Sequence, residues 1–416
     1  MAISTEQPGP PTARYHEKRE ALMDAAARLF NSDGVKGATL ARIAASVGLV
    51  TNSVTYYYRK KEDLARACFL RSIAALDALA AGAVGRTTVA ERLQSFFRGY
   101  AQLLADMESG RHPQLLNFND IRSLPSEHAV DVFEAYTNMF RRVRRLLKGY
   151  ETAHLARDDL NARAHIVLSI AHWVRTWIQS YEVEEYPRMA DRISDILLHG
   201  LAAAGSTWST ADGELVSRLA PETMSMPEAF LCAATVLVNE QGYRGASVDK
   251  ISARLNVTKG SFYHHHDTKQ DLITECFKRT FSIARQALRM AEAGTGTGWH
   301  RACAATRALV RFQLTASGPL LRTSAISALR DQAHRDEIRQ SMYRLTERMA
   351  SLLVDGMMDG SIRPLDSSIA SRAIFAAINA AAELHRWVPN ATLDTVSDVY
   401  ARPIFEGVLC PAPAGH

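Results

Sequence analysis

Cysteine is scarce in this 416-residue sequence, and no two cysteines are spaced as a pair. The five are Cys68, Cys232, Cys276, Cys303 and Cys410, and the Cys-x-x-Cys motif of zinc and redox sites does not occur among them. Their odd number also argues against a disulfide framework. We therefore expect buried, structural cysteines and a reducing, cytoplasmic location.

Long apolar runs and enzyme motifs are missing as well. No apolar run reaches the ~18–20 residues of a membrane-spanning helix, and the N-terminus lacks the apolar region of a signal peptide. Gly-x-Ser-x-Gly, P-loop, His-Glu-x-x-His and Gly-x-Gly-x-x-Gly motifs do not occur. We therefore expect no membrane partner, no cofactor and no enzymatic activity.

The chain has the composition and length of two ordinary globular domains. Hydrophobic residues make up 47% and charged residues 22%, and 416 residues suit two domains of about 200 residues each. The formal net charge of +5 is compatible with a polyanionic partner, but an excess this small is shared by many soluble proteins. Charge alone therefore decides little.

The sequence repeats itself. Residues 34–39, GVKGAT, return as residues 242–247, GYRGAS, 208 positions later, and Lys61 meets Lys269 at the same shift. A whole-unit tandem duplication is the simplest account, with small drifts in the shift caused by loop insertions. Further matches at shifts of 206 to 210 are Pro113 with Pro319, His128 with His334, Trp177 with Trp387, and Gly200 with Gly407.

Residues 39–64 have the pattern of two short helices joined by a tight turn. A helix-turn-helix needs a small residue where the helices cross, a residue that tolerates the left-handed conformation in the turn, and an apolar anchor on the second helix. Both copies meet these requirements, since Asn is the second choice after Gly for the turn. The three positions are Ala44, Gly48 and Val54 in the first copy, and Ser252, Asn256 and Phe262 in the second.

The order of these features resembles the DNA-binding domain of TetR-type transcription regulators. In each copy a helix leads into Gly-x-x-Gly-Ala-(Thr/Ser), the helix-turn-helix follows, and Lys-(Glu/Gln)-Asp-Leu opens a fourth helix. The second copy matches the family's Val-Thr-Lys-Gly-Ser-Phe-Tyr signature at residues 257–263, and the first departs from it at Val50, Asn52 and Thr55. The resemblance implies an all-α fold of two tandem units, each a helix-turn-helix DNA-binding domain plus a helical ligand-binding and dimerisation domain.

Composition and periodicity divide the chain into six segments. Pro, Gly, Ser and Thr dominate the N-terminal arm, and small and polar residues dominate the boundary between the units. Elsewhere helical periodicity prevails, with helices predicted at residues 20–31, 113–121 and 320–330 among others. The segments are a disordered arm (1–16), DNA-binding domain 1 (17–64), regulatory domain 1 (65–204), a linker (205–225), DNA-binding domain 2 (226–272) and regulatory domain 2 (273–416).

The candidate DNA contacts lie on and around the second motif helix of each copy. Thr39 and Ser247 are suited to cap the first motif helix, whose N-terminal amides also point toward a phosphate. Lys61 and Lys269 resemble the family's phosphate-binding lysine, and a solvated helix face is the alternative for the remaining positions. The DNA-binding set is Thr39, Thr51, Asn52, Thr55, Tyr56, Tyr57, Lys61, Ser247, Thr258, Lys259, Gly260, Tyr263, His265 and Lys269, with Thr51, Asn52, Tyr56 and Lys259 as the base-edge candidates.

The helical domains are expected to hold ligand cavities, because those of the family do. Aromatic and polar side chains at helical spacing supply candidates, although aromatic residues at this spacing are commonly plain hydrophobic core. The effector itself is not identified by the sequence. The ligand-binding candidates are Phe118, Phe133, Tyr136, His172, Trp173, Trp177, Asn379, Glu383 and Trp387.

Two polar runs suggest other functions, and neither is favoured. The three consecutive histidines at residues 264–266 point in three directions on a helix and so cannot easily converge on one metal ion. The Arg-Arg-Val-Arg-Arg run at residues 141–145 lies in a regulatory domain, where a solvated helix face is the simpler interpretation. We predict no metal site.

The duplication bears on assembly. Regulators of this type are typically two-fold dimers that read two half-sites through symmetry-related helices. Here residues 158–203 are expected to pack against residues 367–408 within one chain, as an intramolecular pseudo-dimer. Because the two recognition helices differ, we predict a repressor on a double-stranded DNA operator with unlike half-sites, released by an unknown small-molecule effector. The alternatives are a homodimer of whole chains, a DNA-binding protein without an effector, and activation instead of repression.

Overall fold

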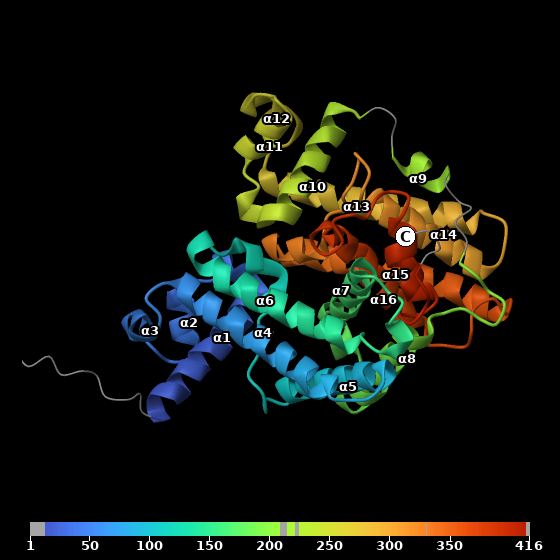
Figure 1. The fold of residues 1–416 in the computed structure, drawn as a ribbon. Helices are drawn as coiled ribbons and strands as arrows, with labels where there is room; N and C mark the ends of the chain where they lie inside the picture. Colours follow the sequence, from blue (N-terminus) through green and yellow to red (C-terminus); the bar gives the residue numbers. More distant parts are fainter. Residues whose placement is uncertain (1–12, 209–213, 221–223, 330, 413–416) are drawn as a thin grey trace, which may run out of the picture.

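The protein is all-α in the computed structural model, which describes residues 13–208, 214–220, 224–329 and 331–412 (Figure 1). Within these ranges no β-strand occurs, although one isolated antiparallel bridge joins Ala202 to Ile362. The predicted fold class is therefore confirmed. Residues 1–12 of the expected arm lie outside the described residues, whereas Ala13 to His16 form the first turn of a helix, so the prediction of disorder is wrong there.

Each half begins with the three helices of a helix-turn-helix unit, continues into a long linking helix and ends in a helical body. The first half contains α1 (Ala13–Gly37), α2 (Leu40–Ser46), α3 (Thr51–Tyr57), α4 (Lys61–Val84), α5 (Val89–Glu108), η1 (Phe118–Ser123), α6 (Ser126–Leu146), η2 (Tyr150–Thr152), α7 (Arg157–Val174), η3 (Ile178–Ser180), η4 (Val183–Glu185) and α8 (Tyr186–His199). The boundary and second half contain α9 (Glu214–Leu219), α10 (Met226–Gly245), α11 (Val248–Arg254), α12 (Lys259–His265), α13 (Lys269–Glu292), α14 (Gly298–Phe312), η5 (Thr323–Ala328), α15 (Gln332–Met358), α16 (Ser367–Ala381), η6 (Leu384–Arg386), η7 (Ser397–Ala401) and α17 (Arg402–Phe405).

Local sequence explains where the long helices begin and bend. At the start of α5 the Thr88 hydroxyl accepts a hydrogen bond from Glu91 N at 3.1 Å, and the Glu91 carboxylate accepts one from Thr88 N at 3.0 Å. Thr268 and Asp271 form the same capping box at the start of α13. Near its C-terminal end α1 is interrupted at Gly34, whose φ of 73° is a left-handed conformation that glycine adopts without steric cost.

The two helices predicted at residues 113–121 and 320–330 are wrong. Each segment is an extended stretch followed by a short 3₁₀ helix, η1 or η5. The reason is that side chains of neighbouring helices take the backbone hydrogen bonds that a helix would form internally. Leu116 N donates to Ser72 Oγ at 2.8 Å, and Asn117 N donates to Asn31 Oδ1 at 2.8 Å.

The second half repeats this arrangement atom for atom. Leu321 N donates to Thr280 Oγ1 at 2.9 Å, and Arg322 N donates to Asn239 Oδ1 at 3.1 Å. Asn31 Nδ2 and Asn239 Nδ2 also donate to the carbonyls of Leu115 and Leu320, each at 2.9 Å. The first helix of each half is therefore fastened to the same loop of its own helical body.

The C-terminal helices of the halves pack against each other, α7 and α8 against α16 and the segment around α17 (Figure 1). Leu201 N donates to Phe405 O at 2.7 Å, and Val408 N donates to Leu197 O at 2.7 Å. Leu201 and Val408 are themselves equivalent positions, 207 residues apart. In one bond the first half donates and the second accepts, and in the other the roles are reversed. The donors are equivalent positions and the acceptors differ by one residue, as in an approximate two-fold interface.

Two glycines allow this close approach. A Cβ on Gly200 would lie 2.2 Å from Phe405 O, and a Cβ on Gly407 would lie 2.3 Å from Leu198 O. Both glycines also have left-handed φ values, 63° and 90°. Because Leu198 and Phe405 are again 207 residues apart, the backbones of the two halves touch at one repeated position.

Helix α4 bears on the expectation that the chain has no membrane-spanning helix. Among the described residues it alone is long and apolar enough to cross a membrane, with 24 residues and a mean hydropathy of 1.6 over its most apolar window. It packs against α1, α5 and α6, and Leu64, Phe69 and Leu76 are buried. A core helix passes the same length and composition test, so this is weak evidence for a membrane span.

None of the five cysteines forms a disulfide, and all five are buried. Cys68 Sγ donates to Met23 O and Cys276 Sγ donates to Leu231 O, each at 3.5 Å. Burial raises the pKa of both thiols to about 12, which keeps them protonated at neutral pH. Their expected role in core packing is confirmed.

Candidate nucleic-acid interface and inter-half cluster

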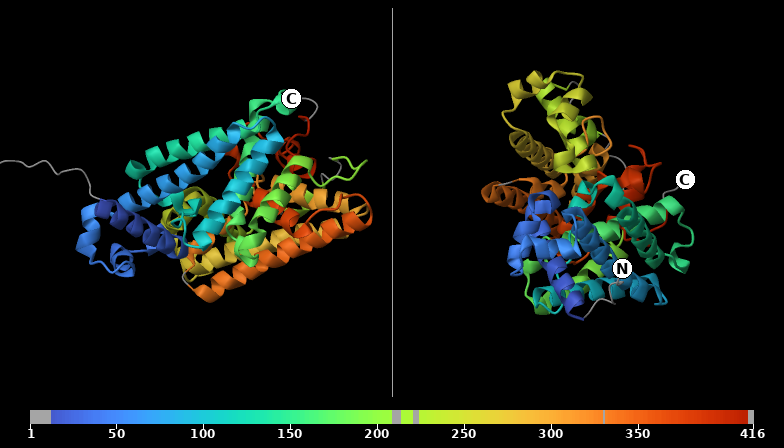
Figure 2. Two further views of the ribbon diagram at one scale, coloured as in Figure 1. Left: turned by 90° about the horizontal axis from the view of Figure 1, so that it is seen from below. Right: turned by 90° about the vertical axis from the view of Figure 1, so that its left-hand side faces the viewer.

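The two helix-turn-helix units lie at separate corners of the molecule, as views at right angles agree (Figures 1 and 2). We call α1–α3 head 1 and α10–α12 head 2. The turn between the motif helices contains Gly48 with φ 67° in head 1 and Asn256 with φ 55° in head 2. The left-handed turn predicted for both copies is therefore confirmed.

The crossing and anchor positions are also confirmed. Ala44 and Val54 in head 1 are 1% and 0% exposed, and Ser252 and Phe262 in head 2 are 3% and 0% exposed. Their burial fixes the rotation of α3 and α12, so that the opposite face of each helix is turned toward solvent.

In head 1 that face is polar and uncharged. Thr51, Asn52, Thr55 and Tyr56 are exposed, Tyr56 to 75%, and the Thr55 hydroxyl donates to Asn52 O at 2.9 Å. Tyr57 is half-buried. These side chains are accessible to a duplex, and contact with bases or phosphates remains a prediction.

In head 2 the corresponding face carries a charge. Thr258, Lys259 and Gly260 are exposed and Tyr263 is 52% exposed, while the Thr258 hydroxyl caps α12 by accepting from Ser261 N at 3.4 Å. The side chain of His265 lies outside the described set.

Lys259 is already paired within head 2. Its ammonium lies 2.9 Å from the Asp249 carboxylate, whose hydrogen bond and charge raise the pKa of Lys259. Head 1 has Ala41 at the position of Asp249, so this acidic neighbour is peculiar to head 2. Contact between Lys259 and a guanine or a phosphate would have to replace the pairing with Asp249.

The two predicted cap residues cap α2 and α11. Thr39 Oγ1 accepts from Arg42 N and Ser247 Oγ accepts from Lys250 N, each at 3.2 Å. Their hydroxyls therefore satisfy helix amides, and a phosphate would be met by the remaining amides of the first turn.

Lys61 and Lys269 have a structural role that the sequence did not indicate. Lys61 Nζ donates to Ala38 O at 2.9 Å and to Lys36 O at 3.3 Å. Lys269 Nζ donates to Tyr243 O and lies 4.0 Å from the centroid of the Tyr243 ring. Each ammonium thus ties the start of the linking helix to the end of the first helix, and the assignment to phosphate remains a prediction.

Head 1 contains a residue that the sequence analysis missed. The Tyr15 ring packs 4.8 Å from the Tyr57 ring and 6.0 Å from the Tyr56 ring, measured between centroids. Tyr15 was assigned to the disordered arm because composition says nothing about which side chains fold back on a later helix. The first turn of α1 therefore flanks the recognition helix of head 1.

Several ligand-binding candidates meet at the boundary between the halves. The Phe118 ring lies 5.4 Å from the Tyr136 ring and 5.0 Å from the His172 ring, and the Tyr136 ring lies 6.3 Å from the Trp387 ring. Glu383, close to Trp387 in the chain, completes what we call the inter-half cluster. The first three residues come from the first half and the last two from the second.

Two arginines of the cluster were not foreseen. Arg122 of η1 and Arg322, which precedes η5, both donate to the Glu383 carboxylate. Burial pushes the pKa of the Glu383 carboxyl up, but the charges of Arg322 and Arg122 outweigh it and hold the pKa below its ordinary value. No local sequence signal marks these arginines, because their partner is 61 and 261 residues away.

Two histidines of the first half, the buried His165 and the half-buried His172, are affected by the charges of this ion pair. Burial lowers the pKa of His172 to about 3 and that of His165 to about 4, so both imidazoles are neutral at physiological pH. Nε2 of His172 and Nδ1 of His165 are buried without a hydrogen-bond partner in the described structure. The cluster therefore combines aromatic rings with polar atoms that lack partners.

Four other ligand-binding candidates lie outside the cluster. Trp173 is buried, Phe133 is partly buried against the core, and the Trp177 ring receives the guanidinium of Arg372 at 4.8 Å. Asn379 Oδ1 accepts from Thr323 N at 3.0 Å and so holds η5 on α16. Binding of a ligand by any of the nine candidates remains a prediction.

The helix-turn-helix geometry has a counterpart among known families. The model described as "Bacterial regulatory proteins, tetR family" matches residues 22–68 and again residues 230–276. The chain carries two tandem tetR-family units. The predicted resemblance and the tandem arrangement are thereby confirmed, and the two matches fall on α1–α4 and α10–α13.

Curated relatives of these tetR-family units match over short segments. The Transposon Tn10 TetC protein of Escherichia coli is 40% identical over 52 residues, which is 12% of this chain and 26% of the relative. The biofilm operon icaADBC HTH-type negative transcriptional regulator IcaR of Staphylococcus epidermidis is 32% identical over 57 residues, 14% and 31% of the two chains. The chain thus spans about a third or less of the length of these relatives.

Solved structures align with less than half of the chain. The TetR family regulator PfmR of Thermus thermophilus is 19% identical, with 42% of this chain and 95% of PfmR covered at a TM-score of 0.36. The ketosteroid regulator KstR2 of Mycobacterium tuberculosis is 18% identical, with coverages of 45% and 97% and a TM-score of 0.36. AibR, in complex with isovaleryl coenzyme A and operator DNA, is 17% identical, with coverages of 43% and 97% and a TM-score of 0.36.

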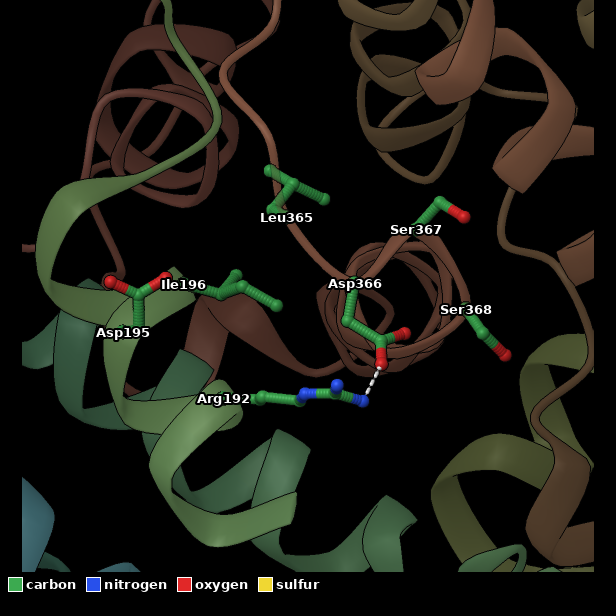
Figure 3. Close-up of a pocket in the computed structure, with 7 residues that line it drawn as sticks. All are labelled: Arg192, Asp195, Ile196, Leu365, Asp366, Ser367 and Ser368. Carbon is green, nitrogen blue, oxygen red and sulfur yellow. Dashed lines mark hydrogen bonds and ion pairs between the residues drawn. The ribbon is translucent and has the colours of Figure 1, made fainter. Parts of the chain in front are cut away.

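A pocket lies elsewhere on the seam between the two halves of the chain, between α8 and the start of α16 (Figure 3). Its volume is ≈ 470 Å³, and it is lined by Arg192, Asp195, Ile196, Leu365, Asp366, Ser367 and Ser368. Arg192 reaches across the pocket to Asp366, the N-cap of α16. None of the predicted ligand-binding residues lines this polar, open pocket.

Metal-ligating side chains are not gathered in the described part of the chain. No group of three or more His, Cys, Asp or Glu residues is placed there to hold an ion. In the histidine run, the His266 ring packs 6.2 Å from Phe230 and 5.7 Å from Phe262 in the core of head 2. Its direction differs from that of the exposed His264, and His266 is the extended C-cap of α12 rather than a residue of the helix.

Proposed function

We propose that the protein is a sequence-specific DNA-binding transcriptional regulator that presents two unlike heads on one chain to an asymmetric operator. The observation that carries the proposal is the reciprocal packing of the two C-terminal regions, in which Leu201 N donates to Phe405 O and Val408 N donates to Leu197 O. In a two-fold dimer such an interface joins two chains and sets the spacing of the two readers. Here one chain contains both sides of the interface and both readers.

Differences between the recognition faces support unlike half-sites. Head 1 offers Asn52 and hydroxyl groups, which suit adenine edges, phosphates and sugars, whereas head 2 offers Lys259, which suits guanine O6 and N7. The same base sequence is therefore not expected to satisfy both faces. Phosphate contacts from either head carry no such preference and add affinity that falls with salt.

Release by a small molecule is the finer part of the proposal. The inter-half cluster supports it, because its rings, its neutral histidines and its ion pair lie next to η1 and η5. Each of these 3₁₀ helices contacts both α1 and α10, the first helices of the heads. A ligand seated there would act on both heads at once, and DNA binding without an effector remains the alternative.

The test is selection of bound duplexes from random double-stranded DNA, followed by affinity measurements on the selected site. Asn52→Ala is expected to relax preference at one half-site, and Lys259→Ala at the other, each by about 1–3 kcal/mol of discrimination. Arg98→Ala is the matched control, since Arg98 is an exposed charge on α5 that pairs with Asp191 of α8 and lies outside both heads. Selection of no sequence, or of a perfect palindrome insensitive to both head substitutions, would contradict the proposal.

The effector is tested separately. A thermal-shift screen of small metabolites should find a compound that raises the melting temperature and lowers affinity for the selected DNA. Tyr136→Phe and His172→Leu should lower the affinity for that compound. Substitution of Arg192, which lines the pocket between α8 and α16, should leave this affinity unchanged. If the parent protein binds its operator and no compound lowers that affinity, the result would favour the alternative, a DNA-binding protein without an effector.

A further inference from the structure

The seam between η1 and η5 is the place where both heads meet the helical bodies. The two 3₁₀ helices contact each other, η1 contacts both α10 and α1, and η5 contacts both α1 and α10. Each head is therefore held by its own half and also by the other half. A contact that holds η1 against η5 therefore also holds head 2 against the first half, because η1 belongs to the first half and packs on α10.

One carboxylate supplies that fixation. Glu383 follows α16, and its carboxylate accepts hydrogen bonds from Arg122 of η1 and from Arg322, the residue before η5. The three side chains are 12–22% exposed, so water competes little for these bonds. Burial lowers the pKa of the Arg122 guanidinium to about 10, which leaves it charged at neutral pH.

Arg122 also reaches head 2 directly. Its second amino group donates to Asn239 O in α10, and Asn239 Oδ1 in turn accepts from Arg322 N at 3.1 Å. The first half thus bonds Asn239 of α10 through the Arg122 side chain, and the second half bonds Asn239 through the backbone N–H of Arg322. Glu383 connects the two arginines, because its carboxylate accepts from both.

The hydrogen bonds of Arg122, Glu383 and Arg322 described above go to head 2 and to one another, and none of them goes to head 1. When the halves are aligned so that Asn117 corresponds to Arg322, the counterpart of Arg122 is Ser327. When they are aligned so that Trp177 corresponds to Trp387, the counterpart of Glu383 is Trp173. One side-chain bond from the second half to α1 joins Arg335 Nη1 to Ser32 O, and it is exposed and 3.5 Å long. The ionic grip is therefore one-sided.

We propose that Arg122, Glu383 and Arg322 form a latch that locks head 2, but not head 1, to the opposite half. While the latch is closed, head 2 keeps one orientation, and opening it frees α10 to move with the second half alone. The latch shares Glu383 with the inter-half cluster, and the charges of Arg122 and Arg322 act on Tyr136 of that cluster. It deepens the proposed function by naming the element through which head orientation is set.

The test uses hydrogen exchange of the full chain without DNA. Arg122→Met removes both bonds made by Arg122 and leaves Glu383 paired with Arg322, so this variant keeps the buried carboxylate neutralised. Backbone amides of α10 and η1 are expected to exchange about tenfold faster, while those of α1–α3 are unchanged. Arg348→Met, which breaks the Arg348–Glu292 pair between α15 and α13, is the matched control and should leave α10 unchanged.

Two results would overturn the latch. One is unchanged protection of α10 in folded Arg122→Met protein, and the other is an equal increase in exchange in both heads. Glu383→Gln should give the same one-sided pattern with a larger increase, and Arg122→Met keeps the test decisive if Glu383→Gln does not fold. Because exchange is measured without DNA, failure of the chain to bind a duplex would remove the proposed function without touching this result.

Discussion

The two halves of the molecule share the hydrogen bonds that hold each head on its own helical body, and they differ at the recognition faces and at the η1–η5 seam. Arg71 pairs with Glu20 and donates to Gln114 O, and Arg279 at the equivalent position pairs with Glu228 and donates to Ser317 O. The asparagine bonds that fasten α1 and α10 are repeated in the same way. Divergence is found instead on the recognition faces and at the η1–η5 seam, where only the second half supplies Glu383.

This comparison teaches which bonds a duplicated unit retains when its halves are no longer identical. Bonds that hold a head on its own body are internal to a half and are the same in both. Contacts across the seam join unlike surfaces and need not stay symmetric, as Trp173 and Glu383 illustrate. The reciprocal glycine contact is the exception, because there each backbone is the other's partner.

The largest effect is expected at that glycine contact. Gly200→Ala and Gly407→Ala each place a Cβ within 2.2–2.3 Å of a carbonyl oxygen of the other half, at a left-handed φ. Each should lower the free energy of unfolding by roughly 2–4 kcal/mol, measured by urea denaturation. Gly82→Ala, where no atom lies within 4 Å, is the control and should cost nothing. A loss confined to one of the two variants would break the symmetry claimed for this contact.

Acid should destabilise the first half in particular. His165 and His172 have folded-state pKa values of about 4 and about 3, and their counterparts at a shift of 210 are Phe375 and Ala382. Since the unfolded chain binds protons at both sites below pH ~6.5 and the folded chain does not, stability is fully present above that pH. It should fall by about 2 kcal/mol per histidine between pH 6.5 and pH 5.

The measurement for this prediction is urea denaturation at pH 7 and pH 5. His172→Leu should remove part of the pH dependence, whereas His300→Gln, an exposed histidine on α14, should leave it unchanged. An identical pH dependence in parent and His172→Leu protein would mean that the pKa of His172 is the same in the folded and the unfolded chain, which would contradict the prediction.

The fastening asparagines should have comparable but unequal effects. Asn31→Ala and Asn239→Ala each remove bonds to a loop amide and a loop carbonyl, at about 1–2 kcal/mol each in urea denaturation. Asn239 is the more buried of the two, so loss of its side chain should have the larger effect. Asn138→Ala, on the exposed face of α6, serves as control, and equal values for it and Asn239→Ala would refute the fastening role.

The smallest effect is expected at the helix caps. Thr39→Ala and Ser247→Ala should each cost about 1 kcal/mol, because each leaves one helix amide without its acceptor. Circular dichroism during thermal unfolding measures the loss of stability. Thr39→Ser should lose much less stability than Thr39→Ala, because serine also caps a helix. A large difference between the two caps would mean that the heads unfold separately from their bodies to different extents.

Local chemistry explains which parts of the fold were predictable. Gly48 and Asn256 marked the two motif turns, since few residues tolerate a left-handed backbone, and Thr39 and Ser247 marked the helix starts. The extended stretches before η1 and η5 were missed because Ser72, Asn31 and their equivalents are distant in sequence. Periodicity alone could not show that those side chains take the backbone hydrogen bonds of another segment.

The candidate site divides along the same line. Exposure of Asn52, Tyr56 and Lys259 follows from the buried anchors one helical face away, so sequence placed them on the surface correctly. Tyr15, Arg122 and Arg322 acquire their roles only from tertiary contacts. The same is true of Lys61, whose bonds to Ala38 and Lys36 depend on how the fourth helix meets the first.

The central claim is that one chain provides both DNA-reading heads for one operator. Native mass spectrometry of the protein on its selected duplex measures this directly, since the chain contributes 45.9 kDa per copy. The account predicts one chain per duplex, with footprints of both heads on the same DNA. Two chains bound to a palindrome, each through a single head, would contradict it.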